Sequence, residues 1–156
     1  MSVEIGLSAG DIAFASTEAS SRFYYDRMLK AEFKGMGGSW VEQLGLEISG
    51  CLGEIAVGRW LDRYPFSLFK ERKQGDVGEF EVRATGHATG RLLISPDDNS
   101  ERKYLLVTIP TWEKAIIHGW MWGYEAKDAK YWNTYMPKPV FAVGQQFLHD
   151  PNTLIR

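Results

Sequence analysis

The chain has 156 residues, enough for one domain with a buried core, and its 44% apolar and 24% charged residues are typical of a globular protein. A net charge of −2 excludes a generally basic coat for nucleic acid and leaves room only for a local basic patch. The single cysteine, Cys51, excludes an internal disulfide and a cysteine-based zinc site, which suits a reducing cytoplasm. We expect neither export nor membrane insertion, because the sequence has no signal segment and no long apolar run.

The first predicted helix begins near Ser16 or Thr17, because either side chain can cap a helix and apolar residues recur along one side after them. The glycines between 35 and 38 end it. Arg22 and the other basic residues of this helix are expected to form a solvated face. Residues 1–15 carry little pattern.

A second, longer helix is predicted from Trp40 to Leu61, since Ser39 and Glu42 have the spacing of a capping box. It contains four glycines, each of which costs about 1 kcal/mol relative to alanine, and close approach of a neighbouring backbone is the simplest compensation. Glu47 and Glu54 share one face of this helix. Glu54 has apolar neighbours, so it either pairs with another side chain or serves a site, and we favour the pairing.

The stretch from 75 to 85 is predicted as a turn that leads directly into a strand. Two glycines bracket the turn, and apolar and charged residues then alternate with the period of a strand. Glu81 and Arg83 therefore project from one face of the strand, and Asp76 lies at its entrance. Acids beside a cation at the start of a strand suit a metal or phosphate site.

A basic cluster, formed by Lys70, Arg72 and Lys73, immediately precedes this stretch. A basic loop beside an acidic strand entrance fits phosphate binding next to a metal, and solvated loop charge is the alternative interpretation. The same segment contains a short strand at 66–69.

Further elements complete the chain. Strands at Arg91–Ser95, Lys103–Ile109 and Ala115–Trp122 are joined by short turns and are therefore predicted as a meander. The strand at Lys103–Ile109 is almost continuously apolar, so we expect it to be buried on both faces. A short polar helix at 123–132 and a last strand at either 140–143 or 145–148 follow. His87 and His118 have no second histidine or cysteine at metal-ligand spacing, so we expect structural roles for both.

A glycine-flanked helix glutamate followed by an aspartate and a Glu-x-basic strand resembles the PD-(D/E)XK nuclease superfamily, the restriction-endonuclease-like fold, in particular its small, often phage-encoded members. The matching residues are 50–56 (Gly-Cys-Leu-Gly-Glu-Ile-Ala), Asp76 and Glu81-Val82-Arg83. The resemblance implies an α/β (α+β mixed) single domain with a central mixed sheet flanked by helices. It places a nuclease-like core at about 39–150, preceded by an N-terminal helical extension. If the protein is encoded by a phage, it would act in the cytoplasm of the host.

The resemblance also implies a site. Asp76 and Glu81 would bind Mg²⁺ or Mn²⁺, Glu54 would assist them, and Arg83 would take the place of the family's lysine. Carboxylate oxygens suit these ions, which lower the pKa of a bound water and stabilise charge on a phosphate. The implied partner is DNA or RNA, and its phosphate backbone would be contacted by Lys70, Arg72, Lys73 and Arg91. The resemblance implies no membrane partner, and it implies a homodimer as the possible assembly.

Two departures from the family pattern leave alternatives open. Arg83 cannot be deprotonated, although it can clamp a phosphate with two hydrogen bonds. The short spacing between Asp76 and Glu81 leaves Glu79 or Asp97 open as an alternative second ligand. The sequence therefore supports a metal-dependent nuclease that cuts phosphodiester bonds, a catalytically silent relative that binds nucleic acid or protein, or a structural ion-pair network around Arg83.

Overall fold

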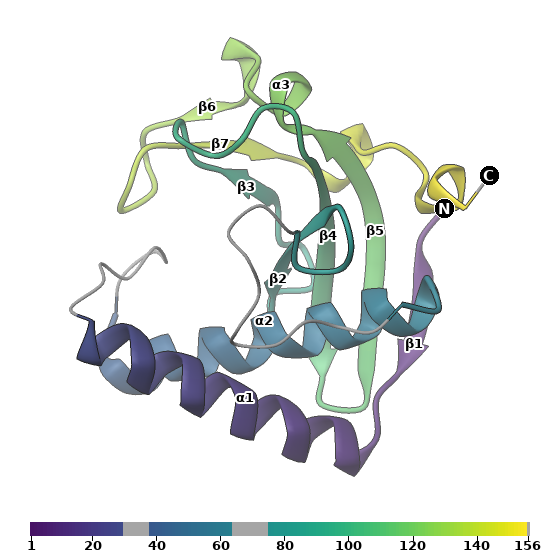
Figure 1. The fold of residues 1–156 in the computed structure, drawn as a ribbon. Helices are drawn as coiled ribbons and strands as arrows, with labels where there is room; N and C mark the ends of the chain where they lie inside the picture. Colours follow the sequence, from purple (N-terminus) through teal and green to yellow (C-terminus); the bar gives the residue numbers. More distant parts are fainter. Residues whose placement is uncertain (30–37, 64–74, 156) are drawn as a thin grey trace.

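The structure is a computed structural model, and it describes residues 1–29, 38–63 and 75–155. The chain has a mixed α+β fold in which two long helices lie side by side below two small sheets (Figure 1). The strand predicted at 66–69 and the predicted nucleic-acid contacts Lys70, Arg72 and Lys73 lie outside the described residues.

Helix α1 (Ala9–Met28) begins earlier than the sequence patterns predict. Its cap is Ser8, whose hydroxyl oxygen accepts the Asp11 N–H at 3.2 Å while the Asp11 carboxylate accepts the Ser8 N–H at 2.7 Å. The predicted start at Ser16 or Thr17 is therefore wrong. Hydroxyl residues in the middle of the helix instead donate to carbonyls one turn back, as Ser20 does to Ser16 at 2.7 Å, so they do not end or begin it.

Helix α2 (Trp40–Trp60) has the predicted capping box, with the Ser39 N–H donating to the Glu42 carboxylate at 2.6 Å. Its buried centre packs through Gly53 on the four-stranded sheet of the fold. A Cβ at that position would lie 2.7 Å from the Ala84 Cβ, so close approach explains this glycine, although the neighbouring atoms belong to side chains and not to the predicted backbone. The same explanation is wrong for Gly45 and Gly50, where a Cβ would meet nothing within 4 Å.

Sheet A has the order β1-β5-β4-β2, formed by β1 (Val3–Gly6), β5 (Lys114–Trp122), β4 (Lys103–Thr111) and β2 (Phe80–Thr85). Strands β4 and β5 form an antiparallel hairpin, and β1 pairs antiparallel with β5. Strand β2 runs parallel to β4, which requires the chain to cross over between them. Because β1 completes the sheet and α1 packs against α2, the N-terminal segment is an integral part of the fold.

Sheet B has the order β3-β7-β6, formed by β3 (Leu92–Ile94), β7 (Val140–Val143) and β6 (Trp132–Asn133). The predicted meander is therefore wrong, because β3 leaves the run of strands and pairs with β7. The last strand is at 140–143, the first of the two predicted alternatives. The predicted helix at 123–132 is divided into α3 (Gly123–Ala126) and the 3₁₀ helix η1 (Ala129–Tyr131); two more 3₁₀ helices, η2 (Gln145–Phe147) and η3 (Pro151–Leu154), end the chain.

Strand β4 separates two hydrophobic cores, which explains its near-continuous apolar sequence. Leu105 and Val107 face the core between sheet A and the helices. Tyr104 and Leu106 face the core shared with sheet B. The prediction that this strand is buried on both faces is confirmed. No helix in the described part of the chain is long and apolar enough to cross a membrane.

Candidate functional site

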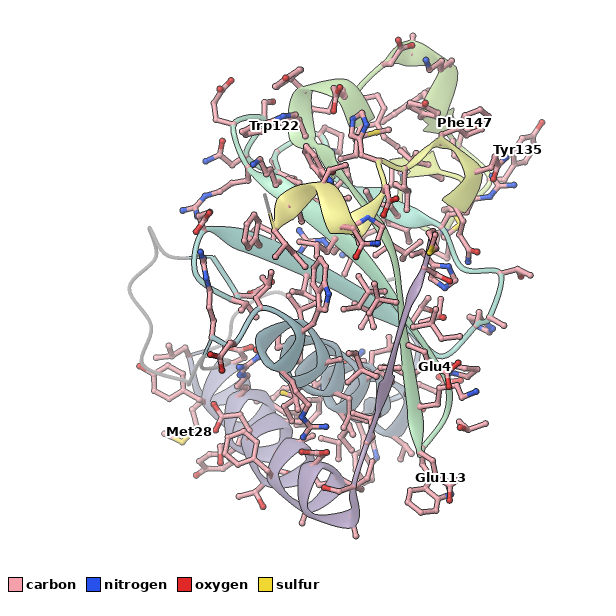
Figure 2. All side chains as sticks on the ribbon, turned by 90° about the vertical axis from the view of Figure 1, so that its right-hand side faces the viewer. Glu4, Met28, Glu113, Trp122, Tyr135 and Phe147 are labelled. Carbon is pink, nitrogen blue, oxygen red and sulfur yellow. The ribbon has the colours of Figure 1, made fainter. Side chains whose placement is uncertain are left out.

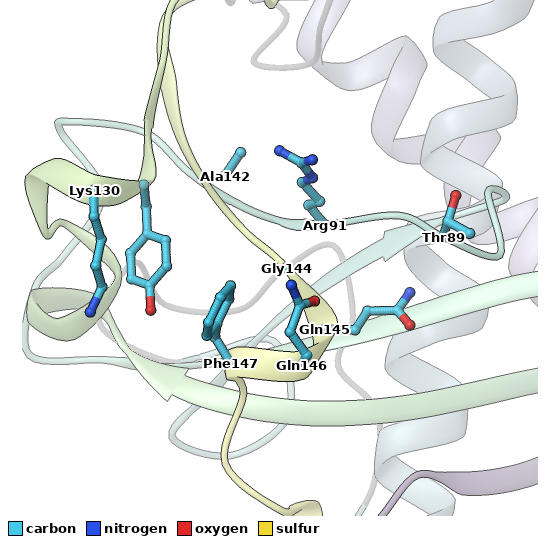
Figure 3. A pocket seen from close by; sticks show the side chains of 9 residues that line it. Thr89, Arg91, Lys130, Ala142, Gly144, Gln145, Gln146 and Phe147 are labelled. Atoms are coloured by element: carbon cyan, nitrogen blue, oxygen red, sulfur yellow. The ribbon is translucent and has the colours of Figure 1, made fainter.

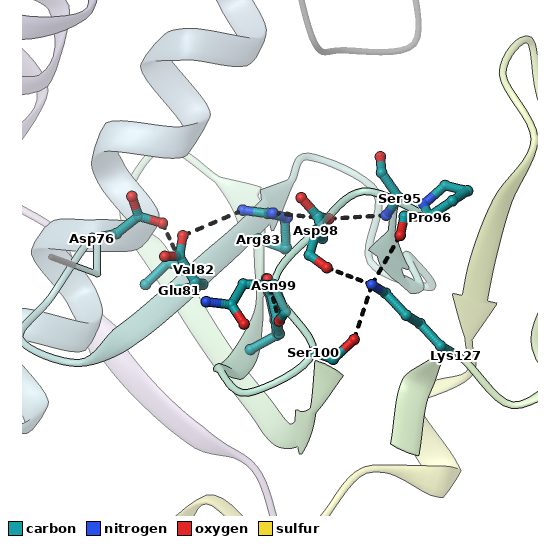
Figure 4. Close-up of polar contacts among 11 residues, drawn as sticks. Asp76, Glu81, Val82, Arg83, Ser95, Pro96, Asp98, Asn99, Ser100 and Lys127 are labelled. Carbon is teal, nitrogen blue, oxygen red and sulfur yellow. Dashed lines mark hydrogen bonds and ion pairs between the residues drawn. The ribbon is translucent and has the colours of Figure 1, made fainter. Parts of the chain in front are cut away.

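The turn before β2 places the Asp76 side chain beside the strand. The Gly75 N–H donates to the Gly78 carbonyl at 2.9 Å, which closes the turn, and Gly78 adopts a left-handed φ of 62°. The chain thus doubles back, and the Asp76 carboxylate accepts the Val82 N–H at 2.8 Å (Figure 4). Asp76 therefore lies against the backbone between Glu81 and Arg83.

Arg83 is surrounded by carboxylates. Its guanidinium lies 3.9 Å from a Glu81 oxygen and 3.2 Å from an Asp98 oxygen, and it stacks over the Tyr104 ring at 5.0 Å (Figure 4). Burial opposes the charged form of Arg83, but the negative charges of Asp98, Asp76 and Glu81 outweigh it and raise the pKa of the guanidinium. Glu81 and Arg83 share one face of β2, as the alternating pattern predicts.

Asp98 belongs to a loop that Lys127 holds in place. The Asp98 carboxylate accepts the Ser95 N–H at 2.9 Å in addition to binding Arg83. The Lys127 ammonium group donates to the Asp98 carbonyl, to the Pro96 carbonyl at 2.9 Å and to the Ser100 hydroxyl at 3.1 Å (Figure 4). The loop between β3 and β4 is thereby fixed so that Asp98 faces Arg83.

Glu54 is bound by Arg22 between α1 and α2. The two terminal guanidinium nitrogens of Arg22 each donate to a different carboxylate oxygen of Glu54 at 2.9 Å. The side chains are only 17% exposed for Arg22 and 9% exposed for Glu54. The prediction that Glu54 has a pairing partner is confirmed. The expectation that Arg22 lies on a solvated helix face is wrong, because its charge neutralises a buried acid.

Glu47 is a second helix acid near the site. Burial raises the pKa of its carboxyl group, Arg22 opposes this increase, and the negative charges of Asp26 and Asp76 add to it. Glu47 is therefore within electrostatic range of Asp76. Its seven-residue spacing from Glu54 was the one sequence signal that it shares the same helix face.

The described acids offer a limited set of metal ligands. Over residues 1–29, 38–63 and 75–155, no three His, Cys, Asp or Glu side chains gather into a group that could hold a metal ion. Glu54, Asp76 and Glu81 thus do not form a three-carboxylate centre. Asp76 and Glu81 still present carboxylate oxygens at one end of β2, and Mg²⁺ is commonly bound by one or two carboxylates with water and substrate phosphate completing its shell.

The alternative ligands and the remaining candidate residues have other surroundings. Glu79 binds Arg63 at 2.6 Å, which lowers its pKa, and Asp97 is exposed. Burial raises the pKa of Cys51 to about 12, so it is a buried, unreactive thiol. His118 shares a hydrogen bond of 2.8 Å with the buried Thr108 hydroxyl, which agrees with a structural role.

Arg91 is the predicted nucleic-acid contact that falls within the described residues. It precedes β3 and lines a hollow beside sheet B (Figure 3).

Three residues of the polar surroundings of β2 were not identified as site residues from sequence patterns: Asp98, Lys127 and Glu47. Asp98 carries one faint local signal, since an aspartate in a turn often accepts a nearby backbone N–H.

Comparisons with known proteins do not add to this picture. The chain matches no family model, no curated protein and no solved structure. Any function for the cluster at the start of β2 therefore depends on its own chemistry.

Proposed function

We propose that the protein is a metal-dependent nuclease that cleaves phosphodiester bonds of DNA or RNA. The supporting observation is the turn that brings the Asp76 carboxylate onto the Val82 N–H, because it gathers an acidic pair and a cation at one end of β2. The resemblance of the sequence to PD-(D/E)XK nucleases implies that Asp76 and Glu81 are metal ligands and that Arg83 takes the place of the family's lysine.

In this proposal each side chain has a defined task. Mg²⁺ or Mn²⁺, when bound, would lower the pKa of a water and stabilise negative charge on the scissile phosphate. Asp76 and Glu81 contribute carboxylate oxygens, and the Val82 N–H holds Asp76 in position. Arg83 binds two phosphate oxygens through its planar guanidinium, which stays protonated and so cannot remove a proton from water.

Glu47 replaces Glu54 as the helix acid of the proposed site. The Glu54 carboxylate is already bound on both oxygens by Arg22. Burial and the charge of Asp76 raise the pKa of Glu47, which brings this carboxylate closer to the range in which it can accept a proton from an attacking water.

Cleavage and thermal melting test the proposal together. Millimolar Mg²⁺ or Mn²⁺ should raise the melting temperature and permit cleavage of labelled DNA or RNA, and the Asp76→Asn and Glu81→Gln variants should lose both effects. Glu113→Gln is the matched control, since Glu113 lies in the β4–β5 hairpin, at the far end of β5 from Trp122 (Figure 2). A metal-independent melting temperature and intact single- and double-stranded substrates would contradict it.

A second candidate function is nucleic-acid binding without cleavage. The observation that favours it is the ion-pair network of Arg83, in which the carboxylates of Glu81 and Asp98 balance the charge of the guanidinium. In this case binding of labelled DNA or RNA would be the same in EDTA and in Mn²⁺, and no product would form. Retained binding together with metal-dependent cleavage would exclude this alternative.

A further inference from the structure

We propose that the hollow beside sheet B binds one nucleotide, with the base against Tyr131 and Phe147 and the phosphate on Arg91. The hollow has a volume of about 550 Å³ and lies between η1, η2 and the turn before β3 (Figure 3). Small-molecule sites typically occupy about 300–1,000 Å³. The site requires neither metal nor cleavage, so it is independent of the nuclease proposal.

The phosphate position is defined by Arg91, which comes from the turn before β3, and none of the described acidic residues lines the hollow. Lys130, from η1, lies over the Tyr131 ring at 4.9 Å, on the side away from Arg91 (Figure 3), and adds positive charge at that end of the hollow. Arginine suits a phosphate because its planar fork donates two parallel hydrogen bonds.

The base position is defined by two aromatic rings. The centroids of Tyr131 and Phe147 lie 5.8 Å apart, with the rings tilted by 55°. Phe147 is 55% exposed, so much of its ring is available to a ligand. Bases of every type stack on aromatic side chains. The amide of Gln146, which also lines the hollow, can donate to and accept from a base edge.

The two sides of the hollow are tied together before any ligand binds. The Gln145 amide donates to the Ala88 carbonyl at 2.9 Å and to the Gly90 carbonyl at 3.0 Å. These bonds connect η2, which carries Phe147, to the turn that carries Arg91. A preorganised site loses less conformational freedom on binding.

The combination favours a nucleotide over its parts. Inorganic phosphate would use Arg91 and leave the rings bare, and an uncharged aromatic compound would leave Arg91 unused. A free nucleotide and the phosphorylated end of a single strand present the same chemistry to this hollow, so the test must distinguish these two sources.

Calorimetric titration of the whole protein in EDTA, which prevents metal-dependent cleavage, provides that test. The ligands are the four nucleoside 5′-monophosphates, their nucleosides, inorganic phosphate and a 5′-phosphorylated tetranucleotide. At least one monophosphate should bind about tenfold more tightly than its nucleoside and than phosphate. Tighter binding of the tetranucleotide would identify a strand end as the ligand, and equal binding would identify the free nucleotide; both results support the proposal.

Variants assign the binding to this hollow. Arg91→Ala and Phe147→Ala change exposed side chains, and each should weaken binding about tenfold. Lys114→Ala is the control: Lys114 follows Glu113, at the opposite end of the molecule from Phe147 (Figure 2), and it should bind like the unaltered protein. Glu81→Gln should also bind normally, which separates this site from the nuclease proposal. No binding by any monophosphate, or equal binding by all variants, would overturn the proposal.

Discussion

The Asp98 carboxylate lies 3.2 Å from the Arg83 guanidinium and joins the β3–β4 loop to the strand that carries the candidate site. The same carboxylate accepts the Ser95 N–H at 2.9 Å, so one side chain both closes its own loop and orients the arginine. Arg83 is consequently held at a fixed place between acids from β2 and from the loop.

Asp98→Asn should destabilise the protein by about 1–2 kcal/mol, because hydrogen bonds to a charged partner are stronger than neutral ones. Urea unfolding measures this difference. Asp97→Asn is a close control, because Asp97 is the neighbour of Asp98 in the sequence and its side chain is exposed. This substitution should change the free energy of unfolding by less than about 0.5 kcal/mol. Equal effects of the two substitutions would show that the ion pair to Arg83 contributes little.

Arg83→Gln should lower the rate of metal-dependent cleavage by about 100-fold or more, because a positive group that binds the reacting phosphate stabilises charge in the transition state. Arg83→Lys keeps the charge and should retain most of the activity. Steady-state rates on one labelled DNA substrate compare the two. A Gln variant as fast as the unaltered protein would place Arg83 outside the reaction.

Glu47→Gln should stabilise the metal-free protein at pH values above the range in which Glu47 titrates. The carboxyl group has a pKa above its ordinary value of 4.5 in the folded state, so the folded protein binds more protons than the unfolded chain between those two values. Stability therefore falls as the pH rises through this window, and glutamine removes that fall. Urea unfolding from pH 4 to 8 measures it, and parallel curves for both proteins would contradict the assignment.

Gly53→Ala and Gly50→Ala should have opposite effects on stability. At Gly53 the added methyl group would lie 2.7 Å from the Ala84 Cβ, and the overpacking should cost about 1–3 kcal/mol. At Gly50 it would meet nothing within 4 Å, so the better helix propensity of alanine should stabilise the protein by about 0.5–1 kcal/mol. Thermal melting of the two variants decides whether α2 contacts β2 at Gly53.

Local sequence signals predicted the features that neighbouring residues determine. The capping box at Ser39, the turn before β2 and the doubly buried strand β4 were predicted because each pattern extends over only a few residues. A stronger hydroxyl-rich pattern further along α1 concealed the equally local cap at Ser8.

Pairings between residues far apart in the sequence could not be predicted from such local signals. The Arg22–Glu54 ion pair joins residues 32 apart, and Asp98 is 15 residues from Arg83. Strand β2 pairs in parallel with β4, while the intervening strand β3 lies in the other sheet and pairs with β7, about 50 residues later in the sequence. A single charged residue carries no information about such a partner, which is why Glu54 was assigned to the site and Asp98 was not.

Calorimetric titration with Mn²⁺ tests most directly whether Asp76 and Glu81 form a metal site at the start of β2. Saturable binding is expected for the unaltered protein and for Glu113→Gln, and it should be lost in both Asp76→Asn and Glu81→Gln while the circular dichroism spectra of the folded proteins remain unchanged. Mn²⁺ binding of equal affinity in all four proteins, or no binding to the unaltered protein in the presence of a nucleic-acid substrate, would contradict it.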